Sequence, residues 1–218
     1  MAAGYICKQH AGADYIRNFG FSNLQSGIDT RKLWRGGVFA WHWHSQVEFL
    51  YVEKGEVTCC VNTSSIRLRE HEGIFINSKE SHSILRNVGV GYIKTILFPA
   101  EFVFDTNNHF CKECIRPIAH QEQYQYIRLT GEKEWQRDVL SEMEKLYHYC
   151  EKNIAKKMSD VIFSVCRIWE NLTSFQQEIP VTDPSQTRSP SQIRLQQLYR
   201  HFRITIATEM VWQMRLSP

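Results

Sequence analysis

The stretch of sequence that decides the fold lies between residues 36 and 55. It reads Gly36-Gly-Val-Phe-Ala-Trp-His42-Trp-His44-Ser-Gln-Val-Glu48-Phe-Leu-Tyr-Val-Glu-Lys-Gly55. His42 and His44 are two residues apart on a segment that alternates like a β-strand, so both imidazoles face the same side. Glu48 follows at an even spacing and joins the two histidines if the strand stays regular. The stretch therefore predicts two histidines and one carboxylate on a single face.

A third histidine follows after the next turns, in the sequence Gly73-Ile-Phe-Ile-Asn-Ser-Lys-Glu-Ser-His82. Together with His42, His44 and Glu48, His82 makes a set of three histidines and one carboxylate. Such a set suits iron, nickel, manganese or zinc. Two other interpretations stay open on the residues alone: direct contact with an organic ligand, and hydrogen bonding within a polar barrel interior.

Short apolar segments surround both stretches. They are broken by Gly, Asn and Ser, which predicts an antiparallel sandwich or barrel. The expected strands cover Val38–His44, Val47–Val52, Val57–Val61, Ile66–Leu68, Gly73–Ile76, His82–Leu85 and Tyr92–Phe98.

The pattern becomes helical near Thr130. Apolar residues then recur with a helical period in two stripes, which predicts helices at 132–150 and 158–174. The stripes consist of Trp135, Val139, Leu140, Met143, Leu146, Tyr147 and Cys150, and of Met158, Val161, Ile162, Val165, Trp169 and Leu172. A short polar link joins them into a helical hairpin. One stripe can pack on the barrel, and the apolar surface that remains can pack on a partner. Trp41 and Trp43 are expected to pack outside the barrel, against the helices.

Residues 178–191 differ in composition from everything before them. They hold three prolines among Ser, Thr and Gln. Such a segment cannot bury enough apolar surface to fold, which predicts a linker. Residues 192–218 follow it.

The first stretch resembles the first motif of the cupin superfamily. That motif is a Gly, five residues, His-x-His, three or four residues, Glu, six residues and Gly. Gly36, His42, His44, Glu48 and Gly55 fit each of its elements. The resemblance implies a cupin-type double-stranded β-helix, or jelly-roll, barrel. With the helices, the expected fold class is mainly β with C-terminal α, a barrel followed by an α-helical hairpin.

The second cupin motif fits in part. Gly73 and His82 are present, but Lys79 and Ser81 stand where Pro and Gly are usual. This variant, with Asn77 before the turn, is similar to the sensor domains of AraC-type transcription regulators. The resemblance covers roughly residues 35–195 and follows that family's order of segments. It implies a barrel at 1–125, a dimerising hairpin at 126–177, a linker at 178–191 and a remnant of a DNA-binding domain at 192–218.

The AraC-type resemblance implies a small-molecule sensor and not an enzyme. The expected effector contacts are His42, His44, Glu48 and His82, with Leu50 on the same strand face as a wall of the site. The same three histidines and Glu48 are the expected ligands of a divalent metal (Zn, Ni, Fe or Mn). A homodimer would form through helices 132–150 and 158–174. DNA would be bound only through a C-terminal domain that this chain lacks. The chain would then be a truncated or frame-shifted gene product, or a natural stand-alone sensor.

Composition adds few constraints on function. The formal net charge is +3, too small to indicate nucleic-acid binding by itself. The N-terminus lacks a secretory pattern and the seven cysteines are an odd number, so a reduced, cytoplasmic protein is expected. The rival class is a metal-dependent cupin enzyme, of dioxygenase or sugar isomerase type, because two histidines and a carboxylate can hold iron with open positions. A metal-responsive sensor is a third interpretation.

Overall fold

The computed structural model describes residues 16–18, 25–27, 38–86, 92–101, 107–119, 121–151 and 158–183. Its elements in chain order are β1 Ile16–Asn18, β2 Gln25–Gly27, β3 Val38–His42, β4 Val47–Lys54, β5 Glu56–Val61, β6 Ser64–Arg69, β7 Gly73–Ile76, β8 His82–Arg86, β9 Tyr92–Phe98, the π-helix η1 Cys111–Ile115, β10 Tyr126–Leu129, α1 Glu134–Glu151, α2 Met158–Ser174 and the 3-10 helix η3 Gln176–Glu178. Gly36 and the expected remnant at 192–218 lie outside the described residues.

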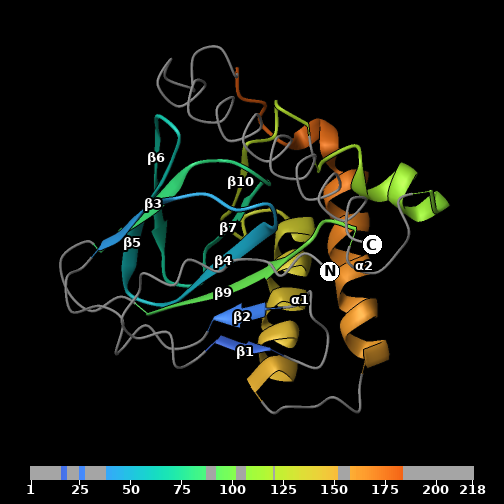
Figure 1. Cartoon of the computed structure of the whole chain (residues 1–218), viewed down its shortest axis with the longest axis horizontal. Coiled ribbons are helices and arrows are strands. Elements are labelled where there is room, and N and C mark those ends of the chain that lie inside the picture. The colour runs from blue at the N-terminus through green and yellow to red at the C-terminus, as the bar shows by residue number, and fades with distance from the viewer. Residues whose placement is uncertain are drawn as a thin grey trace, which may run out of the picture.

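The strands form two antiparallel sheets (Figure 1). The larger sheet has the order β1-β2-β9-β4-β7-β10 and the smaller one β3-β8-β5-β6. Both helices follow the strands in the chain. The expected fold class, a cupin-type barrel followed by a pair of helices, is confirmed.

Apolar side chains fill the space between the two sheets. Alternate residues of each strand point inward, as the pleat of a β-strand requires. The buried members of this cluster are Leu50, Val52, Val57, Cys59, Val61, Ile66, Leu68, Ile74, Ile76, Ile84 and Ile93. The barrel interior is therefore a packed core over most of its length.

The opposite face of the larger sheet packs on the helices. Figure 1 shows α1 against this sheet, with α2 alongside α1. Phe49 and Phe75 of the sheet contact Trp169 of α2 at ring-centroid distances of 6.2 and 5.9 Å. The hydroxyl of Tyr147 on α1 donates to the carbonyl oxygens of Phe49 and Lys94, at 3.0 and 2.7 Å. From Val47 to Val52, strand β4 is thus buried on both faces, which restricts the side chains of these residues.

Strand β10 extends the larger sheet beyond the boundary expected at residue 125. It pairs with β7, from Tyr126 opposite Ile76 to Leu129 opposite Gly73. Its alternation covers only four residues and is followed directly by the helical pattern. The sequence pattern therefore did not predict this strand.

The apolar stripes of both helices are largely buried by packing within this chain. Trp135, Val139 and Met143 of α1, and Val165 and Trp169 of α2, are all buried. The large apolar side chains that stay exposed among the described residues are Trp41, Phe163, Phe175 and Val181. The homodimer expected through helices 132–150 and 158–174 stays a prediction, and Phe163 is the apolar side chain that α2 offers it.

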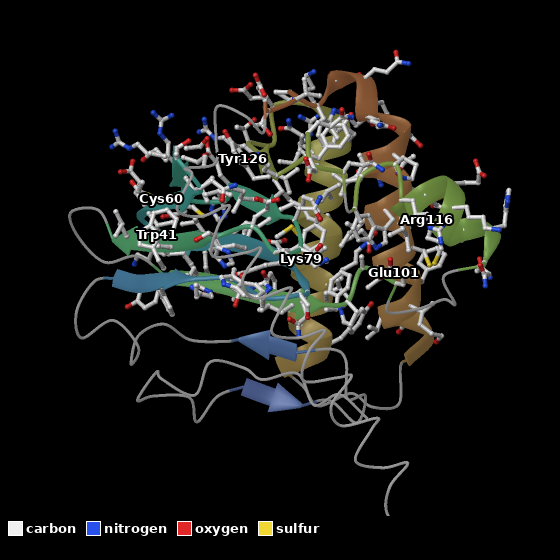
Figure 2. All side chains as sticks on the ribbon, turned by 45° about the horizontal axis from the view of Figure 1, so that its top comes forward. Trp41, Cys60, Lys79, Glu101, Arg116 and Tyr126 are labelled. Carbon is white, nitrogen blue, oxygen red and sulfur yellow. The ribbon has the colours of Figure 1, made fainter. Side chains whose placement is uncertain are left out.

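Trp41 does not pack against the helices, because 53% of it is exposed. Figure 2 shows it on the strands, away from the helices. The expected packing of Trp41 was therefore wrong.

The chain after α2 returns to the barrel. Ile179 is buried, and Thr182 donates to the carbonyl oxygen of Gln123 from its backbone N–H, at 2.9 Å, and from its hydroxyl, at 3.0 Å. The first residues of the expected linker are therefore docked, while residues 184–191 lie outside the described residues. In the part of the chain described here, no helix has the length and apolar character needed to cross a bilayer.

Gly73 is predicted to be essential to the packing of β7 against β4 and α1. A Cβ atom there would lie 2.9 Å from the carbonyl oxygen of Leu50 and 3.0 Å from Cδ2 of Leu140. Gly73→Ala should lower the free energy of unfolding by about 1–3 kcal/mol, because the strand must move. Urea denaturation measures this. Ser65→Ala, at an exposed position of β6, is the control; equal stability of the two variants would contradict the packing described.

Candidate metal centre

A β-bulge in β3 directs His42 into the barrel. Phe39 pairs with Ile84 and His42 pairs with His82, so three steps along β3 match two steps along β8. Phe39 already packs on the barrel core, and strict alternation would turn a residue three positions later outward. The extra residue reverses the alternation, as bulges beside functional sites often do. The rings of His42 and His82 lie with their centroids 4.2 Å apart.

Glu48 is the centre of the cluster. It lies on β4 in the same inward-facing set as Leu50 and is only 4% exposed. Its Oε2 atom is 3.0 Å from Nε2 of His44 and 3.1 Å from Nε2 of His82. The structure therefore brings together the three histidines and the carboxylate that the sequence predicts.

Backbone carbonyls fix how two of the rings are turned. Nδ1 of His44 is 3.0 Å from the carbonyl oxygen of Gln46. Nδ1 of His82 is 2.9 Å from the carbonyl oxygen of Glu80. A carbonyl oxygen only accepts, so each Nδ1 carries the proton and a neutral ring presents a lone pair at Nε2. Both Nε2 atoms are thereby aimed at Glu48, in the orientation that metal-binding histidines adopt.

This geometry requires positive charge within the cluster. A lone pair on Nε2 and a carboxylate oxygen repel each other at about 3 Å unless a proton or a cation lies between them. Protonation of both rings would place a buried cation at His82 beside a partly buried one at His44, with the ring centroids only 5.1 Å apart. One divalent ion supplies the same charge at a single point. The donor set thus fits a metal ion better than it fits two extra protons.

The pKa values of Glu48 and His82 shift in the directions that this mutual stabilisation implies. Burial acts to raise the pKa of Glu48, but its hydrogen bonds to His44 and His82 outweigh burial and hold it well below the usual range. Burial acts to lower the pKa of His82, but the hydrogen bond and charge of Glu48 outweigh it and raise the value. Glu48 is therefore a carboxylate, with negative charge available to a bound cation.

The spacing of the donor atoms also suits a metal. One ligand atom from each of His42, His44, Glu48 and His82 lies within 4.8 Å of all the others. Metal–ligand bonds of about 2.0–2.2 Å separate neighbouring donors by roughly 3–3.5 Å and opposite donors by roughly 4 Å. Small movements of the rings would therefore complete the coordination.

The cluster is more exposed at His42 and His44 than at its other two members. Glu48 and His82 are buried, whereas His42 and His44 are partly exposed. A small molecule or water would therefore approach past His42 and His44. Leu50 lies deeper, fully buried in the apolar core, so contact between an effector and Leu50 would require that core to open.

The sequence did not reveal the residues that hold the cluster in place. Lys79 donates from its backbone N–H to the carbonyl oxygen of His44, at 2.8 Å, and Glu80 provides the carbonyl that binds His82. These are backbone contacts, which side-chain spacing does not report. The only hint was Asn77, noted as a feature of the variant second motif.

Comparisons with known proteins agree with this architecture. The chain matches the family described as Cupin domain over residues 30–98. It is 23% identical, over 138 residues, to the uncharacterized HTH-type transcriptional regulator YdeC of Bacillus subtilis (strain 168). That match covers 62% of this chain and 46% of the relative, so the chain spans about half the length of this curated relative.

Two solved structures are also similar over part of the chain. A cupin-2 domain protein from Shewanella frigidimarina is 19% identical, covers 35% of this chain and 68% of its own, and has a TM-score of 0.28. KdgF from Halomonas sp. is 16% identical, covers 35% of this chain and 70% of its own, and has a TM-score of 0.30. The family match and the two-sheet topology together show that the chain contains a cupin domain.

Loss of His82 is predicted to remove metal binding. His82→Ala deletes a buried donor and leaves Glu48 without one of its two histidine partners. The affinity for Zn²⁺ should fall roughly tenfold or more, because even outer residues of metal sites contribute tenfold. Metal analysis after gel filtration and calorimetric titration measure this. His109→Ala removes an exposed histidine and is the control; Zn²⁺ retained by His82→Ala as by His109→Ala would contradict this site.

Proposed function

We propose that this chain is the sensing part of a cytoplasmic AraC-type transcription regulator, and that it binds a small-molecule effector at a divalent metal. The observation that supports it is the cluster of His42, His44, Glu48 and His82, whose donor atoms all lie within 4.8 Å of one another, beside the apolar core between the two sheets. The similarity to an HTH-type regulator supports the regulatory role.

Each residue of the cluster has a distinct task in this proposal. His44 and His82 present oriented lone pairs, Glu48 supplies the charge, and His42 lies on the partly exposed side. When bound, the metal supplies a Lewis-acid position for an oxygen of the effector, such as a carboxylate or a sugar hydroxyl. The apolar core beneath excludes water from the inner side, which strengthens each polar contact.

The output of the sensor depends on parts that lie beyond the described residues or on a partner. In the proposal, effector binding changes the arrangement of a homodimer that forms through helices 132–150 and 158–174. DNA is bound, in the same proposal, by a C-terminal domain outside the described residues. The similarity to a regulator of which the match covers only 46% supports this separation of sensing from DNA binding.

A metal-dependent enzyme is the second candidate. It is favoured by the partial exposure of His42 and His44, which would let a substrate reach the cluster as well as an effector. The two candidates differ in turnover: an enzyme consumes its ligand, whereas a sensor returns it unchanged. Assay of the metal-loaded protein with small acids and sugars, in the presence of oxygen, separates them.

A metal ion is predicted to stabilise the protein and to be required for effector binding. At one hundred times its dissociation constant, a ligand adds about 2.7 kcal/mol to the unfolding free energy. For a chain of 218 residues this raises the Tm by roughly 5–10 °C. Small acids and sugars screened by thermal shift should act only with metal present, and Glu48→Gln should abolish both shifts. A shift by an effector in metal-free protein would contradict the proposed role of the metal.

The homodimer is predicted to depend on Phe163. This side chain is exposed on α2, so Phe163→Glu should leave the fold intact while it weakens association. Sedimentation velocity at micromolar concentration should show a dimer for the parent chain and a monomer for the variant. Val181→Glu, which changes an equally exposed apolar residue outside the helices, is the control. A monomeric parent chain would rule out the dimer.

A further inference from the structure

One loop holds two of the cluster's histidines. Residues 77–81 join β7 to β8. The backbone N–H of Lys79 donates to the carbonyl oxygen of His44, at 2.8 Å, and the carbonyl oxygen of Glu80 accepts from Nδ1 of His82, at 2.9 Å. A shift of this loop would therefore move the donors of both histidines.

Asn77 fastens this loop to residues 118–119 and 121–125. Its side-chain amide donates to the carbonyl oxygens of Tyr124 and Ile118, at 3.0 and 3.2 Å. Its backbone N–H donates to the carbonyl oxygen of Gln125, at 3.0 Å, and its Oδ1 accepts from the N–H of Ser78, at 2.8 Å. Asn77 is buried, so these bonds are not in competition with bulk water.

A second set of buried hydrogen bonds joins the same loop to the same segment. The amide of Asn62 donates to the carboxylate of Glu80, at 2.7 Å, and to Oε1 of Gln125, at 2.9 Å. All three side chains are buried. The loop is thus tied to the segment before β10 on both sides of Lys79.

The same segment also holds the chain that leaves α2. The carbonyl oxygen of Gln123 accepts both bonds from Thr182, and that of Pro117, one residue before the segment, accepts a bond from the side chain of Gln176, at 3.2 Å. Figure 1 shows the end of α2 beside the segment that leads into β10. Residues 118–119 and 121–125 therefore connect the loop 77–81 with the residues that follow α2.

The loop is held in a conformation that it would not adopt freely. Lys79, labelled in Figure 2, has a φ of +67°, in the left-handed region that long side chains disfavour. Such conformations persist only where surrounding contacts enforce them and cluster at functional sites. In Lys79 the enforcing contacts include the bond to His44, so displacement of His44 would remove one of the contacts that hold this conformation.

We propose that metal binding at the cluster is coupled to the docking of residues 179–183 on residues 121–125, with Asn77 as the positioning residue that transmits the coupling. The inference rests on the proposed metal binding. Metal fixes the distance between the donors of His44 and His82, which fixes the loop that holds both. Through Asn77 the loop fixes residues 121–125, the surface on which Thr182 docks. Because coupling is reciprocal, weaker docking must also weaken metal binding.

Hydrogen exchange of the whole chain tests the first half of this coupling. Addition of Zn²⁺ should slow the exchange of amides in residues 121–125 and 179–183, as well as in residues 77–82. His82→Ala should abolish the slowing in all three segments. Stoichiometric Zn²⁺ binding with unchanged exchange at 179–183 would overturn the coupling and leave the metal site intact. Failure of the parent chain to bind Zn²⁺ would overturn both.

Variants test the reciprocal half. Thr182→Pro removes the backbone N–H and the hydroxyl that bind Gln123, at the far end of the coupled path. Asn77→Asp keeps the acceptor for Ser78 but faces a carboxylate oxygen toward the carbonyls of Ile118 and Tyr124. Each should weaken Co²⁺ binding, by roughly five- to tenfold, and Asn77→Asp should also alter the visible spectrum of the bound Co²⁺.

The control is Thr173→Val, which removes a hydroxyl bond from α2 to the carbonyl oxygen of Cys114, away from the loop. It should leave both the Co²⁺ affinity and the spectrum unchanged. If Asn77→Asp fails to fold, Thr182→Pro decides the question alone, because Thr182 lies after the helices. Co²⁺ affinity within twofold of the parent chain in folded Thr182→Pro would overturn the proposal.

Discussion

The Oε2 atom of Glu48 lies against the Nε2 atoms of two histidines, and the arrangement of this end of the barrel depends on that shared oxygen. Backbone carbonyl oxygens accept hydrogen bonds from Nδ1 of His44 and of His82, so neither Nε2 atom of the neutral rings carries a proton. The contact is therefore favourable only with a cation in the cluster. Burial makes this requirement stronger, because little solvent is present to screen the repulsion.

The rest of the fold brings these groups together and keeps them in place. Strand β4 is packed between the apolar barrel core and the helices, which leaves Glu48 no freedom to turn outward. The bulge in β3 turns His42 inward beside His82. Tyr147 and Trp169 secure the helices to the outer face of the same sheet. The helices thus support the site indirectly, through the strand that carries its carboxylate.

Local sequence pattern predicted those features that depend on local geometry. Strands Gly73–Ile76 and Tyr92–Phe98 were predicted with the bounds that the structure has, because alternation and turn residues mark them. His42, His44 and Glu48 were predicted to lie together, and they do. The single regular strand expected to carry them was wrong, because β3 ends at His42 and Glu48 lies on β4 of the other sheet. The bulge beside His42 was not predicted, since it shows only in the pairing with β8. The role of Asn77 depends on carbonyls some forty residues further along the chain, and no local pattern encodes such a contact.

The central claim is that three imidazoles and one carboxylate bind a single divalent ion. X-ray absorption spectroscopy of the Zn²⁺-loaded protein tests it most directly, because it reports the ligands around the metal. The account predicts nitrogen and oxygen donors at about 2.0–2.2 Å, with the outer-shell scattering of three imidazole rings and no sulfur. A sulfur ligand at about 2.3 Å, or scattering from fewer than two imidazoles, would contradict it.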